Sequence, residues 1–166
     1  MPAERRKATE AEASALASGI RLRIIRLTIS EALTNKELAQ RLGRDPATTL
    51  HHVRKLVDTG FLEPQPARKG ARGAKEIPYR GTGLSWRLEN LGDDGVSEAM
   101  LEAFLAEVAE TGTGELDQSR LVVRLPREQQ EEFRRRLRDL LDEFAARPLD
   151  PDAGALALYL AIYPSP

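Results

Sequence analysis

Two short helices, each with its own start and stop signals, are predicted within residues 34–60, and they constrain the fold more than any other feature of the sequence. Thr34 can accept the first amide hydrogen bonds of the first helix, and Glu37 can reach back to close a capping box. Gly43 suits the positive φ that ends such a helix. Asp45 is a favourable N-cap for the second helix. The chain must therefore form two capped helices joined by a tight glycine turn.

A basic hairpin is predicted after the second helix. FLEP (61–64) indicates a short strand, and the polar, basic segment 65–76 indicates an exposed loop. Beyond the loop, Leu84, Trp86 and Leu88 alternate with polar residues, which indicates a second strand. Two strands around a basic loop form a wing. A capped helix, a turn, a second capped helix and a basic hairpin follow in the order of a winged helix-turn-helix.

Apolar periodicity predicts the remaining elements. Helical spacing indicates three further helices, which cover residues 10–30, 97–110 and 127–146. The first of them is expected to break at Ser18-Gly19. Alternation or short apolar runs indicate two strands, at 121–125 and 155–163. The predicted fold is α+β: an N-terminal winged helix-turn-helix with a small C-terminal α/β (α-β-α-β) unit.

Charge divides the chain into two halves. Residues 1–90 hold 17 Lys and Arg against 10 Asp and Glu, net +7, whereas residues 91–166 hold 8 against 16, net −8. We therefore predict a DNA-binding domain at 1–90 and an acidic domain for dimerisation or effector binding at 91–166, with a boundary near 91–95. The basic half suits a polyanion, which would repel the acidic half.

The second helix of the pair, about 46–58, has the residues and size to enter the major groove of duplex DNA. Its outward positions carry a small side chain, a hydroxyl, imidazoles and cations: Ala47, Thr48, His51, His52, Arg54 and Lys55. The wing, 65–80, offers cations for the phosphate backbone or the minor groove: Arg68, Lys69, Arg72, Lys75 and Arg80. We take these sets, apart from Arg80, as the candidate DNA-binding residues, with Thr48 and His52 expected to read bases.

The sequences ELAQRLG and ATTLHHVRKLVDTGFLE resemble the winged-helix regulators of the ArsR type, and the resemblance covers about residues 20–90. It implies a homodimer that binds an inverted repeat, often as a repressor released by an effector, here a small molecule of unknown identity. Metal sensors of that family usually carry cysteines in or near the helix that matches residues 34–42. This segment has none, so metal sensing is not carried over. Leu50 stands where many relatives have Ser, which leaves the sequence preference open.

Several other functions find little support. The chain has no cysteine, and its two histidines are adjacent, whereas helical metal ligands usually lie four residues apart. We therefore expect neither a metal nor a cofactor, and no enzyme activity. The sequence shows no secretory signal and no apolar run long enough for a membrane span, so we expect a cytoplasmic protein. A winged helix that docks onto proteins, or one that binds RNA, stays an alternative. The arginine run 134–136 is expected to be a solvated face with ion pairs.

Overall fold

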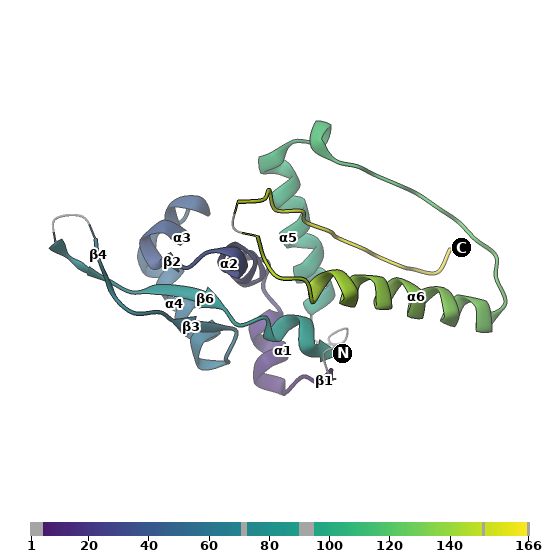
Figure 1. Ribbon diagram of the computed structural model, residues 1–166, viewed down its shortest axis with the longest axis horizontal. Coiled ribbons are helices and arrows are strands. Elements are labelled where there is room, and N and C mark those ends of the chain that lie inside the picture. Colours follow the sequence, from purple (N-terminus) through teal and green to yellow (C-terminus); the bar gives the residue numbers. More distant parts are fainter. Residues whose placement is uncertain (1–4, 71–72, 90–94, 151, 166) are drawn as a thin grey trace. The chain divides into compact units, whose positions relative to one another are not determined.

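The computed structural model describes residues 5–70, 73–89, 95–150 and 152–165. The chain divides into two compact units, Arg5–Glu110 and a second unit that contains the residues from Thr111 onward. The predicted boundary segment 91–95 lies, except for Gly95, outside the described residues. The first unit contains both predicted helices of the pair, and Figure 1 shows its elements.

Two helices lead into the pair. Helix α1 (Glu10–Leu16) begins at a capping box formed by Thr9 and Glu12, and α2 (Gly19–Ser30) follows after a break. The break at Ser18-Gly19 was predicted and is confirmed. Arg21 of α2 donates hydrogen bonds to the carbonyl oxygens of Ser14 and Ala15, near the end of α1, and so holds the two helices at this corner.

Helices α3 (Asn35–Arg41) and α4 (Pro46–Asp58) form the predicted pair. The capping box of Thr34 and Glu37 is present, and the Asp45 side chain accepts hydrogen bonds from the first amides of α4. Gly43 has a φ of 59°, which agrees with its predicted role in the turn. The start and stop signals were read correctly because each depends only on neighbours in the sequence.

A three-stranded sheet lies next to the helices in the order β2 (Leu33–Thr34), β6 (Pro78–Gly81), β3 (Leu62–Pro64), with antiparallel pairing throughout. Strands β3 and β6 extend into a second ladder, β4 (Arg68–Lys69) with β5 (Lys75–Glu76). This β3–β6 hairpin, residues 62–81, is the wing, and Figure 1 shows it reaching away from the helices with β4 near its far end.

The second wing strand is not where the sequence predicted it. Leu84–Arg87 form a 3-10 helix, η2, and the strand that pairs with β3 is β6. Gly83 has a positive φ, which ends the extended backbone before Leu84, and Leu84 packs against the core. Gly81 of β6 lies so close to α2 that a Cβ atom there would approach the carbonyl oxygen of Ile25 to 3.3 Å. Beyond η2, β7 (Leu88–Glu89) pairs in parallel with β1 (Arg6–Lys7).

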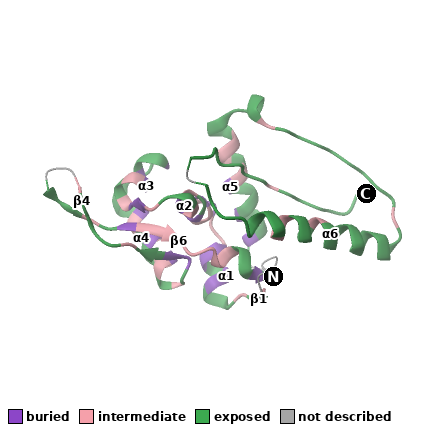
Figure 2. Ribbon diagram, in the orientation of Figure 1, coloured by how far each residue is buried: buried purple, intermediate pink, exposed green. Residues whose placement is uncertain are grey.

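The core of the first unit joins α1, α2, α3 and α4 to the wing. Among its most deeply buried side chains are Leu16 of α1, Ile24 of α2, Leu38 of α3, Val53 and Leu56 of α4, and Phe61 just before β3. Figure 2 shows buried residues on each of these elements. Burying Phe61 or Leu56 in this way stabilises the fold by roughly 1.5–3 kcal/mol per side chain. The orientation of α4 is thus fixed by its buried face.

Helix α5 (Val96–Thr111) also belongs to the first unit, although the sequence placed it in the second domain. Arg23 of α2 pairs with Glu110 at 2.5 Å, and Arg26 pairs with Glu107. Burial raises the pKa of Glu107 above its ordinary value, against the opposing effect of Arg26. These contacts hold α5 beside α2.

The second unit contains a short 3-10 helix, η3 (Thr113–Glu115), and the predicted amphipathic helix, α6 (Arg127–Ala145). The strands predicted at 121–125 and 155–163 are absent from the structure, where both segments lie outside any sheet. A strand needs a hydrogen-bonded neighbour, and two strands with one helix form too small a core to hold such a pairing. Within the described residues, no helix is both long enough and apolar enough to cross a membrane.

Candidate nucleic-acid interface

One face of α4 is buried and the opposite face is open. Thr49, Val53 and Leu56 point into the core. Most of the predicted outward residues of α4 are exposed: Ala47, Thr48, His51 and Arg54. Lys55 is half-buried. The core packing therefore presents hydroxyl, imidazole and guanidinium groups along one side of a helix that a major groove can admit.

The N-terminus of α4 is rigidly capped. The Asp45 carboxylate accepts hydrogen bonds from the amides of Ala47 and Thr48 at 2.9 and 3.0 Å, and from the Thr48 hydroxyl at 3.4 Å. The cap fixes where the first turn begins, and with it the position of Thr48. The hydroxyl keeps its acceptor lone pairs, so Thr48 can still bond a base edge.

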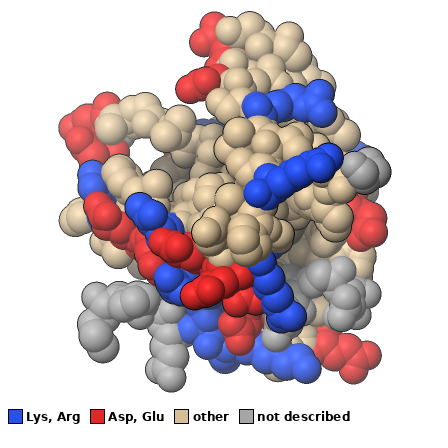
Figure 3. Space-filling model, turned by 90° about the vertical axis from the view of Figure 1, so that its right-hand side faces the viewer, with Lys and Arg blue, Asp and Glu red and all other residues tan. Residues whose placement is uncertain are grey.

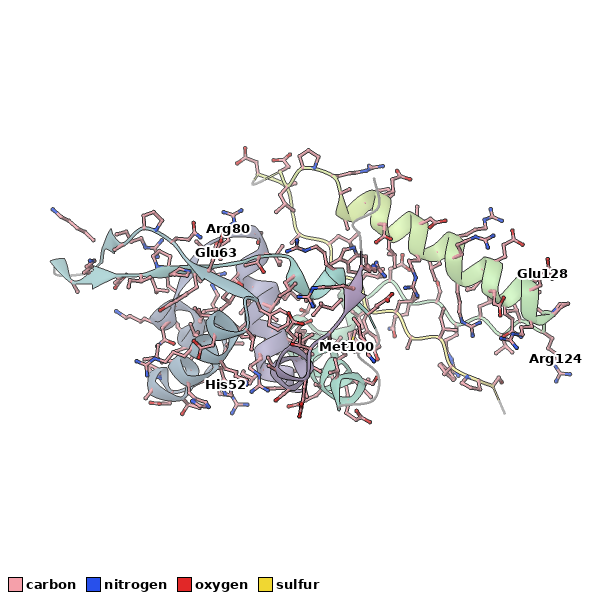
Figure 4. The ribbon with its side chains drawn as sticks, turned by 90° about the horizontal axis from the view of Figure 1, so that it is seen from below. His52, Glu63, Arg80, Met100, Arg124 and Glu128 are labelled. Atoms are coloured by element: carbon pink, nitrogen blue, oxygen red, sulfur yellow. The ribbon has the colours of Figure 1, made fainter. Side chains whose placement is uncertain are left out.

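His52 differs from the other predicted contact residues. It is half-buried, and its Nδ1 atom is buried with no hydrogen-bond partner among the described residues. Burial lowers the pKa of His52 below its ordinary value, and Arg21, His51 and Arg44 lower that pKa further. A neutral imidazole with one buried nitrogen can offer DNA only Nε2. His51, which is exposed, presents more of its ring (Figure 4 shows where His52 lies).

The cations of the wing have two different environments. Arg68 donates a 2.5 Å hydrogen bond to Glu37, the carboxylate of the α3 capping box. Lys69 and Lys75 instead face each other as partners in the ladder, and the described residues give neither an ion-pair partner. Like charges directly opposite one another are unfavourable. A phosphate between the two ammonium groups would remove that repulsion, which makes this end of the wing suited to a polyanion.

Arg72 and Arg80 complete the set of predicted wing cations. Arg72 lies outside the described residues. Arg80 is the ladder partner of Glu63, and Figure 4 shows the two side chains close together on β6 and β3. A neighbouring carboxylate reduces the attraction of Arg80 for phosphate, so Lys69 and Lys75 are the cations of the described wing that are best placed to bind an anion.

Sequence reasoning missed three residues near this face. Arg44 is exposed in the turn between α3 and α4, and Lys36 is exposed in the first turn of α3. The helix before a recognition helix crosses the DNA backbone, so a cation in either place could have been predicted to contact a phosphate. Glu37 was read only as a cap. Its partner Arg68 is 31 residues away, and no local pattern predicts that contact. Hydrogen bonds from Thr34 and the charge of Arg68 together lower the pKa of Glu37.

The arginine run of α6 lies apart from these groups in the sequence and is exposed, as predicted. Arg136 pairs with Glu132 at 3.6 Å, and two further pairs, Arg127–Glu131 and Arg147–Glu143, occupy the same helix or its end. Figure 3 shows acidic and basic side chains interspersed over one face of the molecule. Among the described residues, no three His, Asp or Glu side chains are grouped so as to hold a metal ion.

Residues 16–65 match the model of a helix-turn-helix domain family. The matched segment runs from the end of α1 through α4 to the first wing strand, which confirms the helix-turn-helix that the capping signals predicted. No curated protein sequence matches the chain.

Several solved structures are similar at low identity. Reduced HlyU from Vibrio cholerae is 21% identical, covering 55% of this chain and 81% of that one, with a TM-score of 0.35. A mutant of ZitR from Lactococcus lactis is 20% identical, covering 76% and 75%, with a TM-score of 0.35. The transcriptional regulator SlyA is 18% identical, covering 76% of each chain, with a TM-score of 0.33. Likenesses at this level support no functional inference about this chain.

Proposed function

Residues 16–65 form a helix-turn-helix domain, and on that premise we propose that the chain is a dimeric transcriptional regulator that binds duplex DNA sequence-specifically. Helix α4 enters the major groove, and the wing contacts the phosphate backbone or the minor groove. The protein acts in the cytoplasm as an ArsR-like repressor at an inverted repeat. The acidic C-terminal part serves dimerisation, effector binding or both.

The exposed side of α4 carries the proposal. A helix whose buried side is fixed by Val53 and Leu56 offers Thr48, His51 and Arg54 outward, with no large apolar side chain among them. A surface that docks onto proteins would be rich in aromatic and aliphatic groups. Hydroxyl and imidazole groups bond base edges, and a guanidinium binds guanine or phosphate.

The wing supplies the second contact. Lys69 and Lys75 lie opposite one another at the end of a two-stranded ribbon, and their mutual repulsion favours a bound anion. Arg68 is paired with Glu37 in the free protein, so it must leave that carboxylate to reach a phosphate. We therefore assign the two lysines to the phosphate backbone and expect Arg68 to contribute less to the affinity for DNA.

Dimerisation is proposed through α5 rather than through α2. Helix α2 offers less surface for a partner, because Ile24 and Ile25 are buried within their own chain. On α5 the exposed fractions of Met100, Leu101 and Leu105 are 45%, 45% and 56%. Such a row of exposed apolar side chains is typical of an interaction surface.

Selection from a random duplex pool, followed by fluorescence anisotropy on the recovered sequence, tests this function. We expect a two-fold symmetric consensus, because a symmetric dimer places two copies of α4 on half-sites about 34 Å apart. Recovery of no consensus, together with equal affinity for duplex DNA and single-stranded RNA, would contradict the proposal. A reporter gene behind the consensus distinguishes repression from activation.

A further inference from the structure

Helix α6 carries an apolar seam that the described residues leave uncovered. Phe133, Leu137, Leu140 and Phe144 recur at spacings of four, three and four, and no residue of α6 is buried. The exposed fractions of Phe133, Leu140 and Phe144 are 44%, 50% and 55%. Together with Leu125, part of this seam lines an open groove along the helix. A seam with alternating steps of three and four is the pattern of two helices packed side by side.

The charges of α6 are arranged in blocks along the same helix. Residues 134–138 contain four arginines, and residues 139–143 contain three acids. The two blocks lie on either side of a point between Arg138 and Asp139, close to the middle of the seam. A helix with this order of charges is complementary to itself when the second copy runs in the opposite direction.

We propose that α6 pairs with α6 of a second copy of this chain, antiparallel, about a two-fold axis near residues 138–139. In this register Phe133 of one copy packs on Phe144 of the other, and Leu137 packs on Leu140. Each arginine block then faces an acidic block. The inference extends the dimer of the proposed function to a second interface, and it does not depend on DNA binding.

The residues beside the seam decide the direction. In the antiparallel pair, the positions that precede Leu137 and Phe144 come together, which places Arg136 against Glu143 of the other copy, twice by symmetry. A parallel pair would set Arg136 beside Leu141 and would align the two arginine blocks. Opposite charges beside a seam select the partner and the orientation, so the antiparallel arrangement is favoured.

The size of α6 limits what this interface does alone. A helix of 19 residues is about 28 Å long. Two such helices bury less than the roughly 800 Å² per partner of a standard interface. The α6 pair therefore adds to the α5 contact and strengthens the dimer.

Charge reversal tests the pairing on the full chain without DNA, by sedimentation equilibrium. Arg136→Glu and Glu143→Arg should each raise the dimer dissociation constant about tenfold, whereas the combined variant should return it to within about threefold of the parent. Each reversal also breaks an ion pair inside its own helix, Arg136–Glu132 or Arg147–Glu143. The combined variant keeps both of those losses, so the ion pairs within the helix cannot account for a recovery.

Arg135→Glu is the matched control for Arg136→Glu, because it changes the net charge by the same amount but lies away from the seam and should leave dimerisation unchanged. Circular dichroism on every variant checks that the helix still forms. The proposal would be overturned if the single reversals dimerise as tightly as this control, or if the combined variant dimerises more weakly than either single variant. In that case α6 covers another part of its own chain or binds a different protein.

The relative orientation of the two α6 helices can be measured separately. Because the chain contains no cysteine, one introduced cysteine carries the only spin label of each copy. A label at Glu128→Cys lies 10.5 residues from the proposed axis. At 1.5 Å per residue, the two labels of an antiparallel pair are about 30 Å apart along the helices, whereas those of a parallel pair are separated only across the pair, by about 20 Å for side chains on its outer faces. A pulsed electron spin resonance distance near the shorter value would exclude the antiparallel arrangement.

Discussion

Thr48 has the environment that a base-reading side chain needs: it is exposed, and the Asp45 cap fixes its position. Thr48→Ala should weaken binding to the selected site by about 1–3 kcal/mol and to random duplex by much less. Anisotropy titrations on both duplexes measure the difference, and Thr113→Ala in the second unit serves as control. Equal losses on the two duplexes would reassign Thr48 to the backbone or to the stability of α4.

His52 gives the fold a pH dependence whose sign follows from its surroundings. Burial, with the charges of Arg21, His51 and Arg44, lowers its pKa in the folded protein below the ordinary 6.5. The unfolded chain therefore binds this proton at a higher pH than the folded protein does. The free energy of unfolding should fall as pH drops below about 6.5 towards the folded-state pKa.

Urea denaturation between pH 7.5 and 5 measures this effect. His52→Gln should flatten the decline, because glutamine has no proton to gain in that range. His51→Gln should keep most of it, since burial of His52, the largest cause of its lowered pKa, is unchanged. A decline of the same slope in all three proteins would show that other groups cause it.

At the scale of elements, the wing should dominate the salt dependence of binding. Each phosphate contact contributes about −0.9 to the slope of log K against log salt. Lys69→Gln combined with Lys75→Gln should therefore make the slope shallower by roughly two contacts per subunit, with Lys7→Gln as the control. If the slope does not change, the β4–β5 ladder does not touch the backbone, and Arg44 or Lys36 becomes the better candidate.

The elements also show how far the sequence could predict this fold. The two capped helices were found because Thr34, Glu37, Gly43 and Asp45 act on their immediate neighbours. Strand positions depend on partners far along the chain. Alternation alone placed a wing strand at 84–88, where a positive φ at Gly83 turns the backbone into a 3-10 helix instead.

The same limit applies to the candidate site. The outward residues of α4 follow from helical spacing, because the buried positions Thr49, Val53 and Leu56 fix the opposite face. The orphaned nitrogen of His52 and the contact of Arg68 with Glu37 depend on packing between separate elements. No spacing rule within one helix or strand contains that information.

At the scale of the whole molecule, the first unit carries its own core and both proposed DNA-contacting elements. Leu16, Ile24, Leu56 and Phe61 are buried in contacts among α1 to α4 and the wing, all within Arg5–Glu110. By contrast, α6 has no buried residue, and the apolar segments 121–123 and 156–163 are largely exposed. Apolar surface on this scale needs a partner, whether a second copy, another protein or a ligand.

Deleting residues 112–166 separates these roles. The remaining chain should stay folded, with the circular dichroism of a helical protein and a cooperative melt, because its core loses none of its members. We expect it to dimerise more weakly by sedimentation, since only the α5 surface is left, and to bind the selected duplex less tightly at equal concentration, since two half-sites need two linked copies of α4. A truncated protein that stays a soluble dimer with full affinity would show that the C-terminal unit is dispensable for assembly. Binding of an effector would then become the better proposal for its apolar segments.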